Sequence, residues 1–193
     1  MDLAVNKVAI LIDCWQTVDQ QLDLMSIKTT KGWLADIESR DIDTVIVATY
    51  DVIDTEWKTP LALNTRKFVG ATNWNKKIES IRLDKMFNGR NNHITNPAVW
   101  NLAKSKKIFT IHYPWEFPAG IIENINEVYM YGQAWDVCVK ERPLGYDFWL
   151  HKTNANIMLS KKSCKFSNKT YVDYDAIPNT IQIKQDVWQM TRM

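Results

Sequence analysis

The chain has 193 residues, of which 46% are hydrophobic and 24% are charged, and its formal net charge is +2. These values are typical of a globular protein, and no run of about 18 apolar residues is present to form a membrane-spanning helix. A net charge this small gives no electrostatic reason to expect a nucleic-acid-binding protein. We therefore expect a soluble protein, without a membrane or nucleic-acid partner, that forms a single domain over residues 1–193.

Cysteine usage points to a reducing compartment. The three cysteines, Cys14, Cys138 and Cys164, are an odd number and contain no Cys-x-x-Cys pair. This spacing suits neither a disulfide framework nor a zinc site. The first apolar segment, residues 8–12, is not followed by a small-residue cleavage site, so we expect no signal peptide. The sequence thus predicts a cytoplasmic protein.

Apolar runs of strand length alternate with helical segments along the chain. We expect helices at residues 32–40, 77–87 and 97–104. Strands are expected at residues 8–12, 44–49, 107–112, 127–131 and 146–150, and a sixth strand or an edge hairpin at residues 180–184. This alternation predicts an α/β fold: a three-layer α/β/α sandwich with a mainly parallel, Rossmann-like sheet.

In an open parallel sheet, functional side chains gather at the carboxyl ends of the strands. Asp13 directly follows the first expected strand. A carboxylate at that edge is not needed for folding, which favours a functional role over the alternative of a helix cap. The other residues at expected strand ends are Tyr50 with Asp51, His112 with Tyr113, and the turn at residues 132–138.

Cys138 closes that turn and is expected at the start of a helix. Free amides and the helix dipole at such a position lower the pKa of a thiol and can hold an oxyanion. A thiolate there would attack a carbonyl carbon. The alternative is a buried, inert cysteine, which is our interpretation of Cys14 and Cys164.

The turn also resembles a known family. Gly132, Ala134, Asp136, Cys138 and Val139 match the Gly-x-Ala-x-Asp-x-Cys-Val segment of the isochorismatase-like cysteine hydrolases, which include the nicotinamidases. The Ile-Asp pair at residues 12–13 is similar to the same pair at the end of that family's first strand. The resemblance implies the same three-layer fold.

The resemblance implies a small-molecule hydrolase that cleaves an amide, ester or related bond. Cys138 would be the nucleophile, Asp13 the acid/base that takes the thiol proton, and the amides of Ala134 and Cys138 the oxyanion donors. A cis peptide bond between Gln133 and Ala134 is also implied, as is a homo-oligomer. We expect no cofactor.

Three features depart from the family pattern. His112 stands where the family has a lysine near the end of strand three; it would orient Asp13, serve as the base for Cys138, or be a core histidine. The family's Asp-x-His metal motif keeps Asp51, but the matching position is Ile53, so we predict no metal site. Pro143 and Gly145 interrupt the segment after the cysteine, which predicts a shorter helix there.

Aromatic side chains lie close to the predicted site. Trp15 and Trp135 each neighbour a proposed catalytic residue, and Tyr113 follows a strand end. Together they would wall a pocket for a planar or aromatic substrate, although core packing explains each one singly.

Two other functions remain open from sequence. A non-catalytic member of the same fold would bind a ligand or a partner. Residues 13–18 also resemble the Asp-x-Asp-x-Thr loop of haloacid dehalogenase-like phosphohydrolases, in which Asp13 would be a nucleophile assisted by magnesium. Because Trp15 replaces the second aspartate and Gln133 the metal-binding acid, we rank this hypothesis below the cysteine hydrolase.

Overall fold

The structure is a computed structural model that describes residues 6–17, 24–42, 44–48, 93–95, 98–99, 102, 105–111, 114–117, 119–168 and 170–192. The helix predicted at residues 77–87 lies outside these ranges, as do Asp51, His112 and Tyr113. Among the described residues no helix is both long and apolar enough to cross a membrane.

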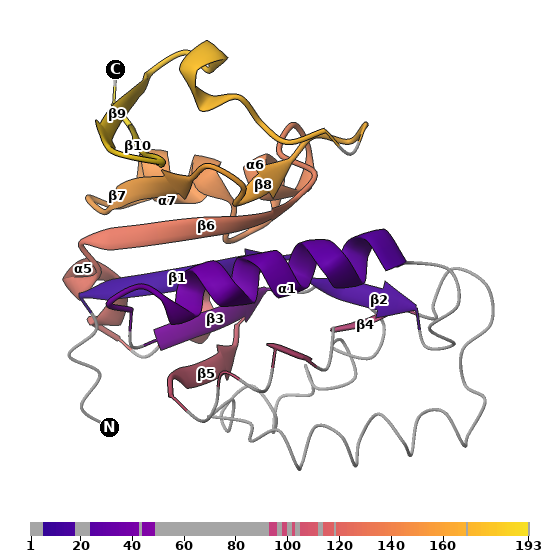
Figure 1. Cartoon of the computed structure of the whole chain (residues 1–193). Coiled ribbons are helices and arrows are strands. Elements are labelled where there is room, and N and C mark those ends of the chain that lie inside the picture. The colour runs from indigo at the N-terminus through magenta and orange to yellow at the C-terminus, as the bar shows by residue number, and fades with distance from the viewer. Residues whose placement is uncertain are drawn as a thin grey trace.

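Most strands of the described residues join one sheet (Figure 1). Its eight strands are β1 (Lys7–Ile12), β3 (Thr44–Ala48), β5 (Lys107–Thr110), β6 (Glu127–Gln133), β7 (Asn156–Ser160), β8 (Cys164–Lys165), β9 (Thr180–Lys184) and β10 (Val187–Met190). They follow the order β5-β3-β1-β6-β7-β10-β9, and β8 pairs with the far end of β6. The sheet is parallel except for the hairpin β9–β10 at one edge, so the prediction of an α/β protein with a mainly parallel sheet is confirmed.

The remaining elements are short, apart from one long helix. The helices are α1 (Leu24–Glu38), α5 (Ile121–Asn124), α6 (Cys138–Glu141), α7 (Tyr146–Lys152) and the 3₁₀ turns η3 (Pro114–Glu116) and η4 (Tyr174–Ala176). A separate two-stranded ribbon pairs β2 (Trp15–Thr17) with β4 (His93–Thr95). Of the helix predicted at residues 97–104, residues 98–99 and 102 have 3₁₀ backbone and the others lie outside the described ranges.

One predicted strand is wrong. Residues 146–150, a run rich in aromatic residues that favour strands, form helix α7 instead. Gly145 directly precedes this helix, and its amide donates a hydrogen bond to the carbonyl of Arg142 in the tight turn from α6. In the helix, Trp149 reaches full burial, which decides the conformation over local propensity. The neighbour of β6 is therefore β7, a strand that the sequence pattern did not indicate.

The two faces of the sheet bury separate apolar clusters, because side chains alternate along each strand. Val8, Ile10 and Ile12 of β1 pack with Trp149 of α7 on one face. Ala9 and Leu11 point the other way and belong to a second cluster with Trp33 and Ile37 of α1. Figure 1 shows α1 on the opposite side of the sheet from α6 and α7. The strand predicted at residues 8–12 is thus buried on both faces.

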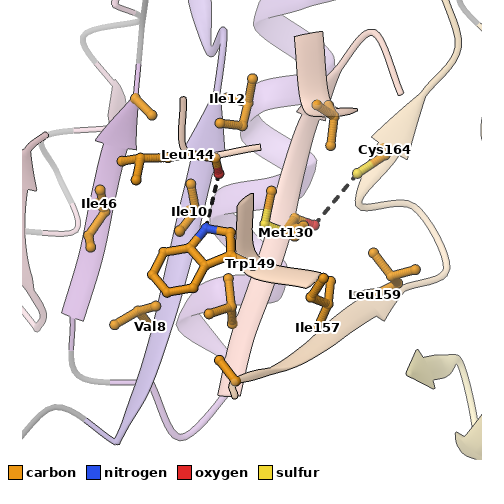
Figure 2. Close-up of a cluster of buried hydrophobic side chains, with 14 of the residues drawn as sticks. Val8, Ile10, Ile12, Ile46, Met130, Leu144, Trp149, Ile157, Leu159 and Cys164 are labelled. Carbon is orange, nitrogen blue, oxygen red and sulfur yellow. Dashed lines mark hydrogen bonds between the residues drawn. The ribbon is translucent and has the colours of Figure 1, made fainter. Parts of the chain in front are cut away.

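Trp149 lies at the centre of the first cluster (Figure 2). Its indole N–H donates to the carbonyl of Leu144 at 3.0 Å, so the polar atom is satisfied inside the core. Figure 2 shows the ring over β1 and β6, beside Ile10 and Met130. This packing fixes α7, and through the turn before it α6, against the strands that carry the candidate site.

Candidate functional site

The sheet brings the two predicted halves of the site together. Strands β1 and β6 are parallel neighbours, with Ile12 opposite Gly132. Asp13 follows Ile12, and the turn that leads to Cys138 follows β6, so both segments leave the same edge of the sheet. This adjacency agrees with the position expected from the order of strands and turns.

Asp13 is a buried carboxylate in an unusual backbone conformation. Its φ of 51° lies in the left-handed region, which few residues other than glycine adopt, although aspartate is among those that tolerate it. The residue is only 8% exposed. Its Oδ2 accepts from Arg142 Nη2 at 3.1 Å and from Arg142 Nε at 3.3 Å. Its Oδ1 is buried and has no hydrogen-bond partner of ordinary geometry among the described residues.

Cys138 begins α6 and is partly buried beside Asp13. Burial raises the pKa of its thiol, and the charge of Asp13 together with a side-chain hydrogen bond to that carboxylate raises the pKa further. The backbone amide of Ala134 and the charge of Arg142 act in the opposite direction. The thiol therefore lies between a carboxylate, a backbone N–H donor and a cation.

The expectation that a helix start lowers this thiol pKa is wrong. Helix α6 has only four residues, so few aligned peptide dipoles stand behind Cys138. Burial and the neighbouring carboxylate outweigh the amide and the arginine, and the net shift of the thiol pKa is upward. Cys138 is thus protonated at neutral pH and needs a base before it can act as a nucleophile.

The turn between β6 and α6 has the backbone that the resemblance implies at one point: the peptide bond between Gln133 and Ala134 is cis. The carbonyl of Ala134 accepts from the amides of Val137 at 3.2 Å and Val139 at 2.9 Å. Asp136 is exposed and accepts from the amide and the hydroxyl of Ser167 at 3.0 and 2.9 Å. These bonds hold the turn, and with it Cys138, in place.

The structure describes only part of the other predicted site residues. Trp135 is buried against Tyr146 and Tyr174, with ring centroids 4.6 and 5.7 Å away, so its packing is that of a core residue rather than a pocket wall. Gln133 ends β6, where it pairs with Lys165. Trp15 is placed only as part of strand β2. The positions of Asp51, His112 and Tyr113 fall outside the described residues.

Two cationic residues near the turn were missed from sequence. Arg142 contacts Asp13, which is 129 residues away in the chain, so no local spacing indicates this contact. Lys165 is buried, donates to the hydroxyl of Thr29 at 2.9 Å and lies 4.6 Å from the ring centroid of Tyr171. No sequence pattern indicates the burial of Lys165, because it depends on β8 pairing with the end of β6.

Within the part of the chain that the structure describes, no three His, Cys, Asp or Glu side chains lie together as a metal site. A surface pocket of about 450 Å³ lies near the C-terminal hairpin and includes neither Asp13 nor Cys138. Its lining mixes both charges with aromatic rings, namely Lys161, Lys162, Tyr171, Val172, Asp173, Tyr174, Asp175, Gln182, Asp186 and Trp188.

Comparison of the chain with models of protein families, with curated proteins and with solved structures found no match. What the fold and the site define is therefore a class: an α/β protein with a mixed, mostly parallel sheet whose edge carries a cysteine, an aspartate and an arginine in mutual reach.

Proposed function

We propose that the protein is a small-molecule cysteine hydrolase, built as a three-layer, Rossmann-like α/β/α sandwich of the isochorismatase-like kind. The observation that carries this proposal is the thiol of Cys138 beside the buried carboxylate of Asp13 at the edge of the sheet. A thiol whose pKa is raised, next to a carboxylate with one unbonded oxygen, is suited to proton-coupled attack on a carbonyl.

The proposed reaction needs only these groups and water. Cys138 Sγ attacks the carbonyl carbon of an amide or ester while its proton passes to Asp13. The oxyanion of the tetrahedral intermediate is held by backbone N–H groups of the turn, among them that of Ala134, whose hydrogen bond lowers the pKa of the thiol. The leaving group takes the proton back from Asp13 as its bond to carbon breaks, which leaves a thioester on Cys138.

Water completes the cycle. A water molecule gives a proton to Asp13 and attacks the thioester carbonyl. The bond to sulfur then breaks, the acid is released, and the proton returns to the thiolate of Cys138. No redox step and no further reactant are required. Because Asp13 is only 8% exposed, its four proton transfers take place in a site largely screened from bulk water, where the attraction between charged groups is stronger than in solution.

The proposal predicts that Cys138→Ser abolishes turnover. A hydroxyl is far less acidic than a thiol, so we expect kcat to fall by at least about 1,000-fold on any active member of a panel of p-nitrophenyl esters and aryl amides. The measurement is release of the chromogenic leaving group. Cys164→Ala is the control, because Cys164 is a fully buried thiol on β8, opposite Gly132, and has no part in the proposed reaction.

Comparable activity in Cys138→Ser and wild type would contradict the proposal, as would an equal loss in Cys164→Ala at matched folded fraction. A protein that turns over no member of the panel yet still binds a ligand after Cys138→Ser would be the non-catalytic binding protein that the sequence left open.

A further inference from the structure

The ion pair between Arg142 and Asp13 joins the segment after α6 to the end of β1. The side chain of Asp13 is 4% exposed, while that of Arg142 is 28% exposed. A carboxylate removed from water to this degree carries a desolvation cost unless an opposite charge and hydrogen bonds compensate it. Arg142 supplies both, through two N–H groups at 3.1 and 3.3 Å.

This contact also decides which carboxylate oxygen is available for chemistry. Both N–H groups of Arg142 donate to the same atom, Oδ2, so Oδ1 is left without a donor among the described residues. The guanidinium group is planar and rigid, so its two hydrogen bonds to Oδ2 restrict the orientation of the carboxylate and hence the position of Oδ1. Cys138, whose thiol lies against Asp13, is the nearby group with a proton to give.

The thiol and the cation belong to one local unit. The amide of Arg142 donates to the carbonyl of Cys138 at 3.1 Å, which closes the last turn of α6. A shift of this turn would therefore move Cys138 and Arg142 together relative to Asp13. The backbone of this turn therefore couples the distance between Cys138 and Asp13 to the distance between Arg142 and Asp13.

We propose that Arg142 is the positioning residue of this site: it compensates the charge of Asp13 and holds that carboxylate beside Cys138 with Oδ1 left unbonded. The inference rests on the proposed function, because the placement of the carboxylate matters only if Asp13 accepts the thiol proton. It adds a residue that acts through Asp13 and not on the substrate.

The ionisation of Cys138 provides a readout that a purely structural role would not move. The charges of Asp13 and Arg142 act on this thiol in opposite directions: Asp13 raises its pKa and Arg142 lowers it. Loss of the arginine charge is expected to raise the pKa of Cys138 further. A rise of one pKa unit lowers the thiolate fraction at pH 7 about tenfold.

The test measures two rates in wild type, Arg142→Gln, Arg142→Lys and Lys140→Gln, with circular dichroism to establish that each variant is folded. The first is alkylation of Cys138 by iodoacetamide against pH, and the second is its acetylation by p-nitrophenyl acetate at pH 7. Lys140→Gln is the matched control, since it removes one positive charge from α6 without touching the ion pair.

We expect Arg142→Gln to move the alkylation midpoint to higher pH and to slow acetylation about tenfold or more. Arg142→Lys keeps the positive charge but loses the pair of N–H donors to Asp13. It should therefore restore the pH midpoint of alkylation but leave acetylation slow. Recovery of both rates in Arg142→Lys would overturn the positioning role, as would an Arg142→Gln variant that behaves like Lys140→Gln. Absence of acetylation in the wild type is a separate result: it overturns the proposed function itself, and the positioning role with it.

Discussion

Replacement of Trp149 by alanine is expected to lower the free energy of unfolding by about 3 to 5 kcal/mol. Trp149 has no exposed surface, and its indole N–H is bonded to the carbonyl of Leu144. Alanine removes a large apolar surface, leaves a cavity between α7 and the sheet, and leaves that carbonyl without its donor (Figure 2). Chemical denaturation followed by circular dichroism measures the loss.

The chain provides a matched control in a tryptophan at the surface. Trp115 lies in η3 and is 73% exposed, so Trp115→Ala should change the free energy of unfolding by less than about 0.5 kcal/mol. Similar losses in the two variants would show that α7 does not pack on the sheet as described.

The second large effect is expected at Gly132 of β6, which lies close to Ile12 of β1 and Val139 of α6. A Cβ atom there would lie 2.7 Å from Cγ2 of Val139 and 2.9 Å from both Cβ and the carbonyl oxygen of Ile12. Because one of these atoms is backbone, the contact is not relieved by a rotamer change. We expect Gly132→Ala to cost about 3 kcal/mol and to slow alkylation of Cys138, since α6 must move away from β1.

Gly32→Ala is the control for this substitution. Gly32 lies in α1, and a Cβ atom added there would have nothing within 4 Å, so alanine should stabilise the helix by about 0.5 to 1 kcal/mol. Thermal unfolding of both variants measures the difference. A Gly132→Ala variant as stable as Gly32→Ala would contradict the close approach of β1 and α6.

Buried strands were the most predictable part of the fold. The strands predicted at residues 8–12, 44–49, 107–112 and 127–131 overlap β1, β3, β5 and β6 of the parallel sheet. The sequence pattern did not indicate strand β7, and the run at residues 146–150 has strand-like composition but is helical. Local propensity fails there because burial of Trp149 depends on tertiary packing that no local pattern encodes.

The part of the candidate site that depends only on the order of strands in the chain was predictable. The end of β1 and the turn after β6 share one edge of a parallel sheet, so Asp13 and Cys138 were expected to meet. The direction of the thiol pKa was not predictable, since it depends on how deeply Cys138 is buried and how near Asp13 lies. Arg142 was missed because its role comes from a contact between segments 129 residues apart.

Acetylation of Cys138 by p-nitrophenyl acetate in Asp13→Asn tests the central claim most directly. The charge of Asp13 raises the pKa of the thiol, so its removal lowers that pKa and increases the thiolate fraction at pH 7. If Asp13 is only a charged neighbour, acetylation becomes faster in the variant. If Asp13 is the base, the thiol loses its proton acceptor and acetylation becomes about 100-fold slower.

The two outcomes change the acetylation rate in opposite directions. The control is Glu141→Gln, which removes one negative charge from α6 at an exposed position. We predict slower acetylation of Cys138 in Asp13→Asn and an unchanged rate in Glu141→Gln, measured by intact mass after acid quench. Acetylation of Asp13→Asn at or above the wild-type rate would contradict the assignment of Cys138 and Asp13 as nucleophile and base.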